Sequence, residues 1–271
     1  VVKTASGPWS EFDFNFSQAP IFYPLNNLTI EKGNFSSAKF YSVANFSEAN
    51  FSEANFSEAI FEDTARFDGA TFAGTAHFDR ATFAGIVRFD GATFAGIAQF
   101  SITTFESIAH FEGATFESVT NFITSIFRSI TLFTDATFRN IANFSMATFK
   151  NSTYFDEATF ERATYFDGAT FIHVDFSEAT FEKYSPLFVT THDESGKTYR
   201  AQFDPLSESQ EVHNLTVSKR SQPIPRGEAE LDGVKCCIPV GTVLFNPSSG
   251  ETSEPAKPLD ESDGLEEDQA E

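Results

Sequence analysis

The chain has 271 residues and a hydrophobic fraction of 41%, enough for one large domain with its own core. Its net charge of −21 argues against direct binding to nucleic acid or to an anionic membrane surface. No apolar run is long enough for a transmembrane helix, and 2 cysteines exclude a disulfide scaffold or a cysteine-built zinc site.

Residues 1–32 are rich in aromatic residues and proline. Phe12, Phe14 and Phe16 alternate with polar residues, which is typical of a strand. We assign this segment to a cap that covers the first unit of the repeat that follows, because the open end of a repeat array needs one.

A periodic array of phenylalanines occupies residues 33–183. From Phe35 to Phe181, 28 Phe follow one another at steps of five or six residues. Between Phe61 and Phe171 the two steps alternate, so the unit there has 11 residues. An α-helix would spread these side chains around its axis, since Phe six residues apart would point about 120° apart. The unit is also rich in Gly and Thr, which are poor helix formers.

Short strands account for the array better than a helix. A small residue stands two positions before nearly every Phe, as Ala44, Ala92 and Ala136 illustrate. Residues i and i−2 share one face of an extended segment, so each strand points one small and one aromatic side chain inward. The residue between them points outward, and a turn follows every five or six residues.

The Ala-Asn-Phe-Ser-Glu units of residues 44–60 resemble the pentapeptide-repeat family, whose unit is Ala-Asp/Asn-Leu/Phe-x-x. The resemblance extends over residues 33–181, with one inserted residue in each 11-residue unit. It implies an all-β fold, a right-handed quadrilateral β-helix with four five-residue sides in each coil. Coils that hydrogen-bond at a spacing of about 4.8 Å would stack the Phe side chains into about seven layers.

The inserted residues predict two columns on opposite sides of a 22-residue coil. One column is Thr75, Ile97, Val119, Ile141 and Ala163, and the other is Ile86, Ile108, Ile130 and Ser152. Either these side chains fill a widened corner of the core, or they form an exposed apolar stripe that docks a partner. Arg88, Tyr154 and Tyr165 are further contact candidates, because they point outward and belong to types favoured at interface hot spots.

Counting by 22 also predicts an acidic ladder. Asp68, Asp90, Glu112 and Asp156 would stack on one outward face, with Thr134 between the last two. Such a ladder is a solvated face, a DNA mimic of the kind by which some pentapeptide-repeat proteins bind type II topoisomerases such as gyrase, or a divalent-cation surface. Arg66 and Arg88 lie beside the ladder and dilute its charge.

The composition changes after the repeat. Residues 184–245 are expected to form a C-terminal cap or a small β-module, with strands at 199–203, 212–218 and 237–245 between glycines. Residues 246–271 are predicted to be a disordered acidic tail. Cys236 and Cys237 are adjacent, so we interpret them as thiols on opposite faces of one strand, or as an intermolecular link or modification site.

No catalytic motif stands out, and His77 and His110 are expected on opposite faces. We therefore predict no enzyme, no cofactor and no metal site. The leading hypothesis is a rigid interaction scaffold that presents flat faces to a protein partner, and the alternative is a DNA-mimicking ligand of gyrase. The sequence does not begin with Met, so we expect an upstream segment. Relatives of this family occur in the cytoplasm, the periplasm and the thylakoid lumen, and the sequence favours none of these compartments.

Overall fold

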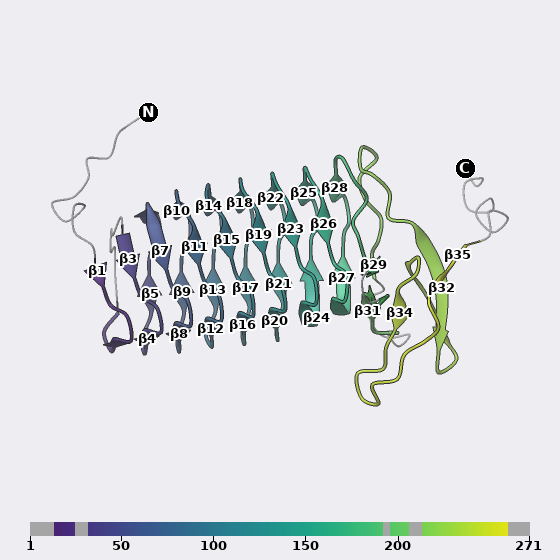
Figure 1. The fold of residues 1–271 in the computed structure, drawn as a ribbon, viewed down its shortest axis with the longest axis horizontal. Helices are drawn as coiled ribbons and strands as arrows, with labels where there is room; N and C mark the ends of the chain where they lie inside the picture. The colour runs from purple at the N-terminus through teal and green to yellow at the C-terminus, as the bar shows by residue number, and fades with distance from the viewer. Residues whose placement is uncertain (1–13, 25–31, 192–195, 206–212, 260–271) are drawn as a thin grey trace, which may run out of the picture.

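The computed structural model describes residues 14–24, 32–191, 196–205 and 213–259. Figure 1 shows an elongated stack of coils with an additional sheet at its C-terminal end. Within the described ranges, no helix is long and apolar enough to span a membrane. The secondary structure there consists of 35 short strands joined by turns.

Four sides form the stack, and every strand on a side pairs in parallel with the equivalent strand of the next coil. The first side holds β1 (Phe14–Asn15), β3 (Lys32–Asn34), β7 (Glu53–Asn55), β11 (Ala76–His77), β15 (Ala98–Gln99), β19 (Thr120–Asn121), β23 (Ala142–Asn143) and β26 (Thr164–Tyr165). The second side holds β2 (Pro20–Ile21), β4 (Lys39–Phe40), β8 (Ile60–Phe61), β12 (Thr82–Phe83), β16 (Thr104–Phe105) and β20 (Ile126–Phe127).

The third side, opposite the first in coil order, holds β5 (Ala44–Asn45), β9 (Ala65–Arg66), β13 (Val87–Arg88), β17 (Ala109–His110) and β21 (Thr131–Leu132). Two longer strands, β24 (Thr148–Tyr154) and β27 (Thr170–Asp175), run around the corner and join the second and third sides. The fourth side holds β6 (Asn50–Phe51), β10 (Thr71–Phe72), β14 (Thr93–Phe94), β18 (Thr115–Phe116), β22 (Thr137–Phe138), β25 (Thr159–Phe160) and β28 (Thr180–Phe181).

The strand register confirms the predicted solenoid of about seven coils. Thr93 pairs with Thr71 and with Thr115, so the coil has 22 residues in the region of alternating steps. His77 and His110 lie on opposite sides, as predicted.

Phenylalanine fills the interior from all four sides. Phe100 is fully buried and stacks on Phe78 at 4.9 Å and on Phe122 at 4.7 Å, with nearly parallel rings. It also meets Phe89 edge-on at 5.5 Å, so each ring has both geometries that aromatic pairs prefer. The residue two positions before each Phe shares this interior and is therefore small.

The N-terminal segment continues the solenoid where the structure describes it. β1 pairs with β3 and β2 pairs with β4, and Phe16 stacks on Phe35 at 5.2 Å. Residues 14–24 therefore form two sides of one more coil. The rest of the predicted cap, including Phe12, lies outside the described residues.

Beyond Phe181 the chain closes the solenoid with one irregular coil. The strands β29 (Val189–Thr191), β30 (Thr198–Arg200), β31 (Gln202–Phe203) and β34 (Val243–Leu244) lie here. Phe188 stacks on Phe166 at 5.2 Å, and Phe203 stacks on Phe171 at 5.3 Å. A three-stranded antiparallel sheet then follows, with β32 (Arg226–Leu231) between β33 (Val234–Pro239) and β35 (Lys257–Pro258).

Two expectations for this region need correction. The predicted strand at 212–218 is only an isolated bridge at Asn214 in the part that is described. The predicted disordered tail is wrong for residues 246–259, because Ala256 is buried and Lys257 pairs with Glu228 of β32. Main-chain hydrogen bonds override the polar composition there, and residues 260–271 lie outside the described part of the chain.

Candidate interaction surfaces

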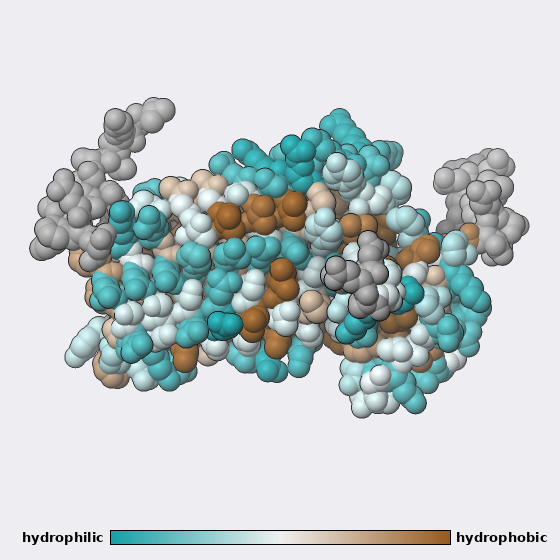
Figure 2. All heavy atoms as spheres, viewed as in Figure 1, coloured by the Kyte–Doolittle hydropathy of each residue, from teal (hydrophilic) through white to brown (hydrophobic). Residues whose placement is uncertain are grey.

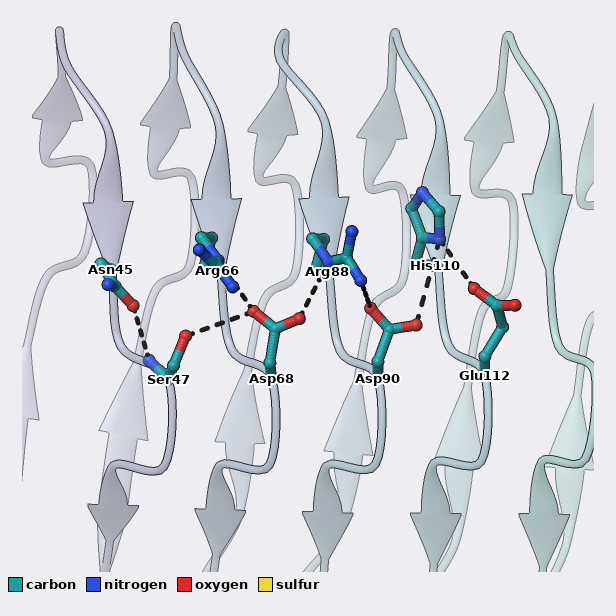
Figure 3. Close-up of polar contacts among 8 residues, drawn as sticks. All are labelled: Asn45, Ser47, Arg66, Asp68, Arg88, Asp90, His110 and Glu112. Atoms are coloured by element: carbon teal, nitrogen blue, oxygen red, sulfur yellow. Dashed lines mark hydrogen bonds and ion pairs between the residues drawn. The ribbon is translucent and has the colours of Figure 1, made fainter.

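The third side of the solenoid carries a charged column, which we call the charged face: Arg66, Asp68, Arg88, Asp90, His110 and Glu112 (Figure 3). Arg66 and Arg88 approach the two oxygens of Asp68 at 3.0 Å and 2.8 Å. The second arginine also contacts Asp90 at 3.0 Å. The stacking of coils thus brings acidic and basic side chains into one continuous ion-pair chain.

Partial burial disfavours the ionised form of the carboxylates in this ion-pair chain. Contacts with arginine determine whether the pKa of each carboxylate is lowered or raised. Desolvation acts to raise the pKa of Asp68, but hydrogen bonds from Arg88 and Arg66 outweigh it and lower that pKa. At Asp90 desolvation prevails, and its pKa is raised. Figure 3 shows why, since Asp68 lies between two arginines whereas Asp90 lies between one arginine and His110.

The predicted acidic ladder is thus a mixed column in the structure. The main-chain bonds Gly69 N–H to Asp90 O and Gly91 N–H to Glu112 O place its members on successive coils. Further along, Thr134 donates a hydrogen bond to Asp156 at 2.9 Å. A surface that imitates the unbroken negative charge of DNA phosphates does not arise from this arrangement.

The end of the charged chain brings together three groups able to ligate a metal. Asp90, His110 and Glu112 place one ligand atom each within 4.8 Å of one another. His110 Nδ1 lies 2.8 Å from Glu112 Oε2, and the guanidinium of Arg88 lies 3.0 Å from Asp90. The arginine would repel a cation, so hydrogen bonds and ion pairs account for this cluster.

The inserted residues lie on the outside of two opposite corners. Ala76 N–H donates to Ile97 O and Ala98 N–H to Val119 O, so the first column stacks along the first side. The second column stacks in the same way beside the charged face. Ile86 is 36% exposed and Ile97 is 37% exposed, and neither column joins the buried core. The interpretation in which they widen the core is wrong, because their aliphatic members are half-buried or exposed and none belongs to the buried core.

The other contact candidates divide between the same two sides. Arg88 belongs to the charged face, and Tyr154, Ile86, Ile108 and Ile130 lie beside it on the third side. Tyr165 lies on the opposite side with Ile97, Val119 and Ile141. The nine candidates thus form two separate surfaces.

The first side has a second apolar border that was not predicted from the sequence. Ile102, Ile123 and Met146 follow the inward Phe of the first side, where other coils carry Ser, Asp, Glu or Arg. Ile102 is 51% exposed and Met146 is 44% exposed. The signal that would have found them is the loss of charged residues from this turn in three consecutive coils, each of which gains an apolar residue instead.

Two histidines lie near the C-terminal end of the solenoid. His213 stacks on His173 at 6.1 Å and meets Phe203 edge-on at 5.2 Å. Burial lowers the pKa of His213 to about 4, against a hydrogen bond to the carbonyl of Asp204. Protonation is therefore unfavourable in the folded chain.

Cys236 and Cys237 are free thiols that alternate along β33. The Cys236 thiol donates to the carbonyl of Pro205 at 3.4 Å. Burial raises the pKa of both thiols, which lowers the thiolate fraction that would react.

The first side is uneven along its length. A hollow of about 720 Å³ lies at its N-terminal end, lined by Asn34, Asn55, Thr75 and His77 among others. The flat part of this side therefore begins with the later coils.

A family model described as pentapeptide repeats (9 copies) matches residues 35–82, 78–126 and 133–180. These matches cover more than half of the chain and coincide with the stacked coils. No curated protein and no solved structure matches the chain.

Proposed function

Because the chain belongs to the pentapeptide-repeat family, we propose that it is a non-catalytic scaffold that binds a partner protein through outward columns of its solenoid. The observation that carries this proposal is the fixed register of those columns. Main-chain bonds between coils hold each outward residue above its equivalent, so binding orders few additional groups.

The charged face is the proposed contact for this partner. Ile86, Ile108 and Ile130 form an apolar edge two residues before the column of Arg88 and His110. Leu132 and Tyr154 extend that column on the following coils. An apolar edge beside arginine and tyrosine combines the residue types that contribute most to interfaces.

Charge pairing favours this scaffold over a gyrase-binding DNA mimic. The carboxylates of Asp68 and Asp90 already contact arginine, so this column does not offer an unbroken row of unpaired negative charge to a DNA-binding protein. We expect no inhibition of gyrase supercoiling by the full chain at low salt, where electrostatic binding is strongest.

Binding tests should compare two double variants on the same coils. The full chain is immobilised, proteins captured from extracts of the source cells are identified, and their affinities are measured. Ile108→Lys with Ile130→Lys should weaken capture at least tenfold, because both half-buried side chains form the apolar edge of the charged face. Thr104→Lys with Ile126→Lys, on the second side, is the matched control and should bind normally. Equal binding by both variants would contradict the proposal, provided that circular dichroism shows both to be folded.

A further inference from the structure

One side of the solenoid lacks charged residues over three consecutive coils. Residues 95–105, 118–127 and 140–149 contain no Asp, Glu, Lys or Arg. The outward side chains of β15, β19 and β23 there are Gln99, Asn121 and Asn143, and Asn121 donates a hydrogen bond to Gln99 at 3.0 Å. We call this part of the first side the amide face.

Apolar side chains border the amide face on both edges. Ile97, Val119 and Ile141 form one edge, and Ile102, Ile123 and Met146 form the other. Figure 2 shows hydrophobic side chains in short rows along the middle of the solenoid, with a hydrophilic row between them. The amide face is thus uncharged across its full width.

The backbone of the turn that carries Ile102 also bears on this border. This residue has φ of 61°, in the left-handed region that disfavours a β-branched side chain. The left-handed conformation recurs down the column, at Arg80, Thr124 and Met146 as well, and Gly168 adopts it at φ of 67° without a side-chain cost. The Ile102 side chain is 51% exposed, so burial in the solenoid does not explain why this position holds isoleucine. Strain of this kind is retained where another contact compensates for it.

We propose that the amide face is the contact between two copies of this chain. Each copy carries a net charge of −21, so two copies repel least when they meet through an uncharged surface. A twofold interface places one patch against itself. Amides suit this, because each both donates and accepts hydrogen bonds. With apolar borders on both edges, apolar groups meet apolar groups whether the solenoids run parallel or antiparallel.

The size of the face indicates a reversible dimer. Three coils at about 4.8 Å spacing, with their borders, cover roughly 400 Å² per copy, about half of what a standard interface buries on each partner. Association should therefore depend on concentration. This inference rests on the proposed function only in treating outward columns as contact surfaces, and it concerns the side opposite the charged face.

Sedimentation equilibrium of the purified full chain tests this directly, without any other protein. At high salt, the wild type should move from monomer to dimer mass as its concentration approaches about 1 mM. Asn121→Asp should remain monomeric, because it places like charges at the centre of the interface. Thr115→Asp, on the fourth side of the same coil, is the matched control and should dimerise as the wild type does.

A third variant separates association from folding. Ile102→Gly should raise the melting temperature by removing backbone strain, and should weaken dimerisation several-fold by removing an exposed contact. A wild-type mass that stays monomeric at every concentration would overturn the inference, as would an equal effect of the two aspartate variants. Neither result would contradict the proposed binding of a partner protein to the charged face.

Discussion

In the solenoid every coil buries the same few residue types, whereas in the C-terminal sheet each buried position is different. Phe78, Phe100 and Phe122 repeat one environment along the axis. In the sheet, Ala229, Leu231 and Ile238 each have their own neighbours. Coils interact only with adjacent coils, so stability in the solenoid is a sum of similar steps, while the sheet depends on a few individual contacts.

The largest expected effects come from truncating a buried side chain in each region. Phe100→Ala should cost about 3–5 kcal/mol, because the fully buried ring leaves a cavity between two stacked rings. Ile238→Ala should cost about 2–4 kcal/mol in the sheet.

Chemical denaturation with hydrogen exchange will locate each effect. Phe100→Ala should lower protection in the coils on both sides of the cavity, and Ile238→Ala should lower it in β32 and β33 alone. If Ile238→Ala unfolded the central coils as well, the two regions would be one cooperative unit.

Acid should affect the junction between the two regions before the middle of the solenoid. The pKa of His213 is about 4 in the folded chain, against about 6.5 when unfolded. The unfolded chain therefore binds the proton more tightly between these values, so stability falls as pH drops from about 6.5 to 4. The loss is about 3 kcal/mol, and below pH 4 it does not grow further.

His213→Gln is the control for this titration. Its amide can still donate to the carbonyl of Asp204 but does not titrate. Denaturation at pH 7 and pH 4 should therefore show a smaller difference for the variant than for the wild type. An identical difference in both proteins would assign the acid sensitivity to other groups.

The repeat explains how much of this fold was predictable. Each position in the coil is sampled many times, so the spacing of Phe and Ala defined the strands, the register and the side to which Ile86 or Ile97 belongs. The spacing did not predict whether the inserted corner residues are buried, because their burial depends on the direction of the turn. It also overlooked Ile102, because only the change of residue type in its turn marks this position and the Phe spacing does not.

The C-terminal sheet was less predictable because its pattern occurs once. In β32, Gly227, Ala229 and Leu231 point inward and alternate with charged residues. Two of the three inward residues are small, so the alternation carries little hydrophobic signal. β35 contains Lys257 and Pro258, and only its main-chain pairing with β32 makes it a strand.

The smallest expected effect concerns one buried threonine in each region. Thr103 donates to the carbonyl of Phe78 at 2.7 Å, and Thr242 donates to that of Pro239 at 2.6 Å. Each carbonyl also accepts a main-chain N–H, so replacing threonine by valine leaves neither acceptor unsatisfied. Each change should cost about 1 kcal/mol, the net contribution of one hydrogen bond.

Differential scanning calorimetry of Thr103→Val and Thr242→Val would show whether the two regions respond separately. Ala81 occupies the position of Thr103 in the preceding coil and Ser125 in the following one, so a coil forms with or without a hydroxyl there and the loss should appear only in the solenoid transition. Thr242 has no repeated equivalent, and its loss should appear only in the transition of the C-terminal region. A loss well above 1 kcal/mol at Thr103 would mean that its hydroxyl organises the coil, which a sum of similar steps does not allow.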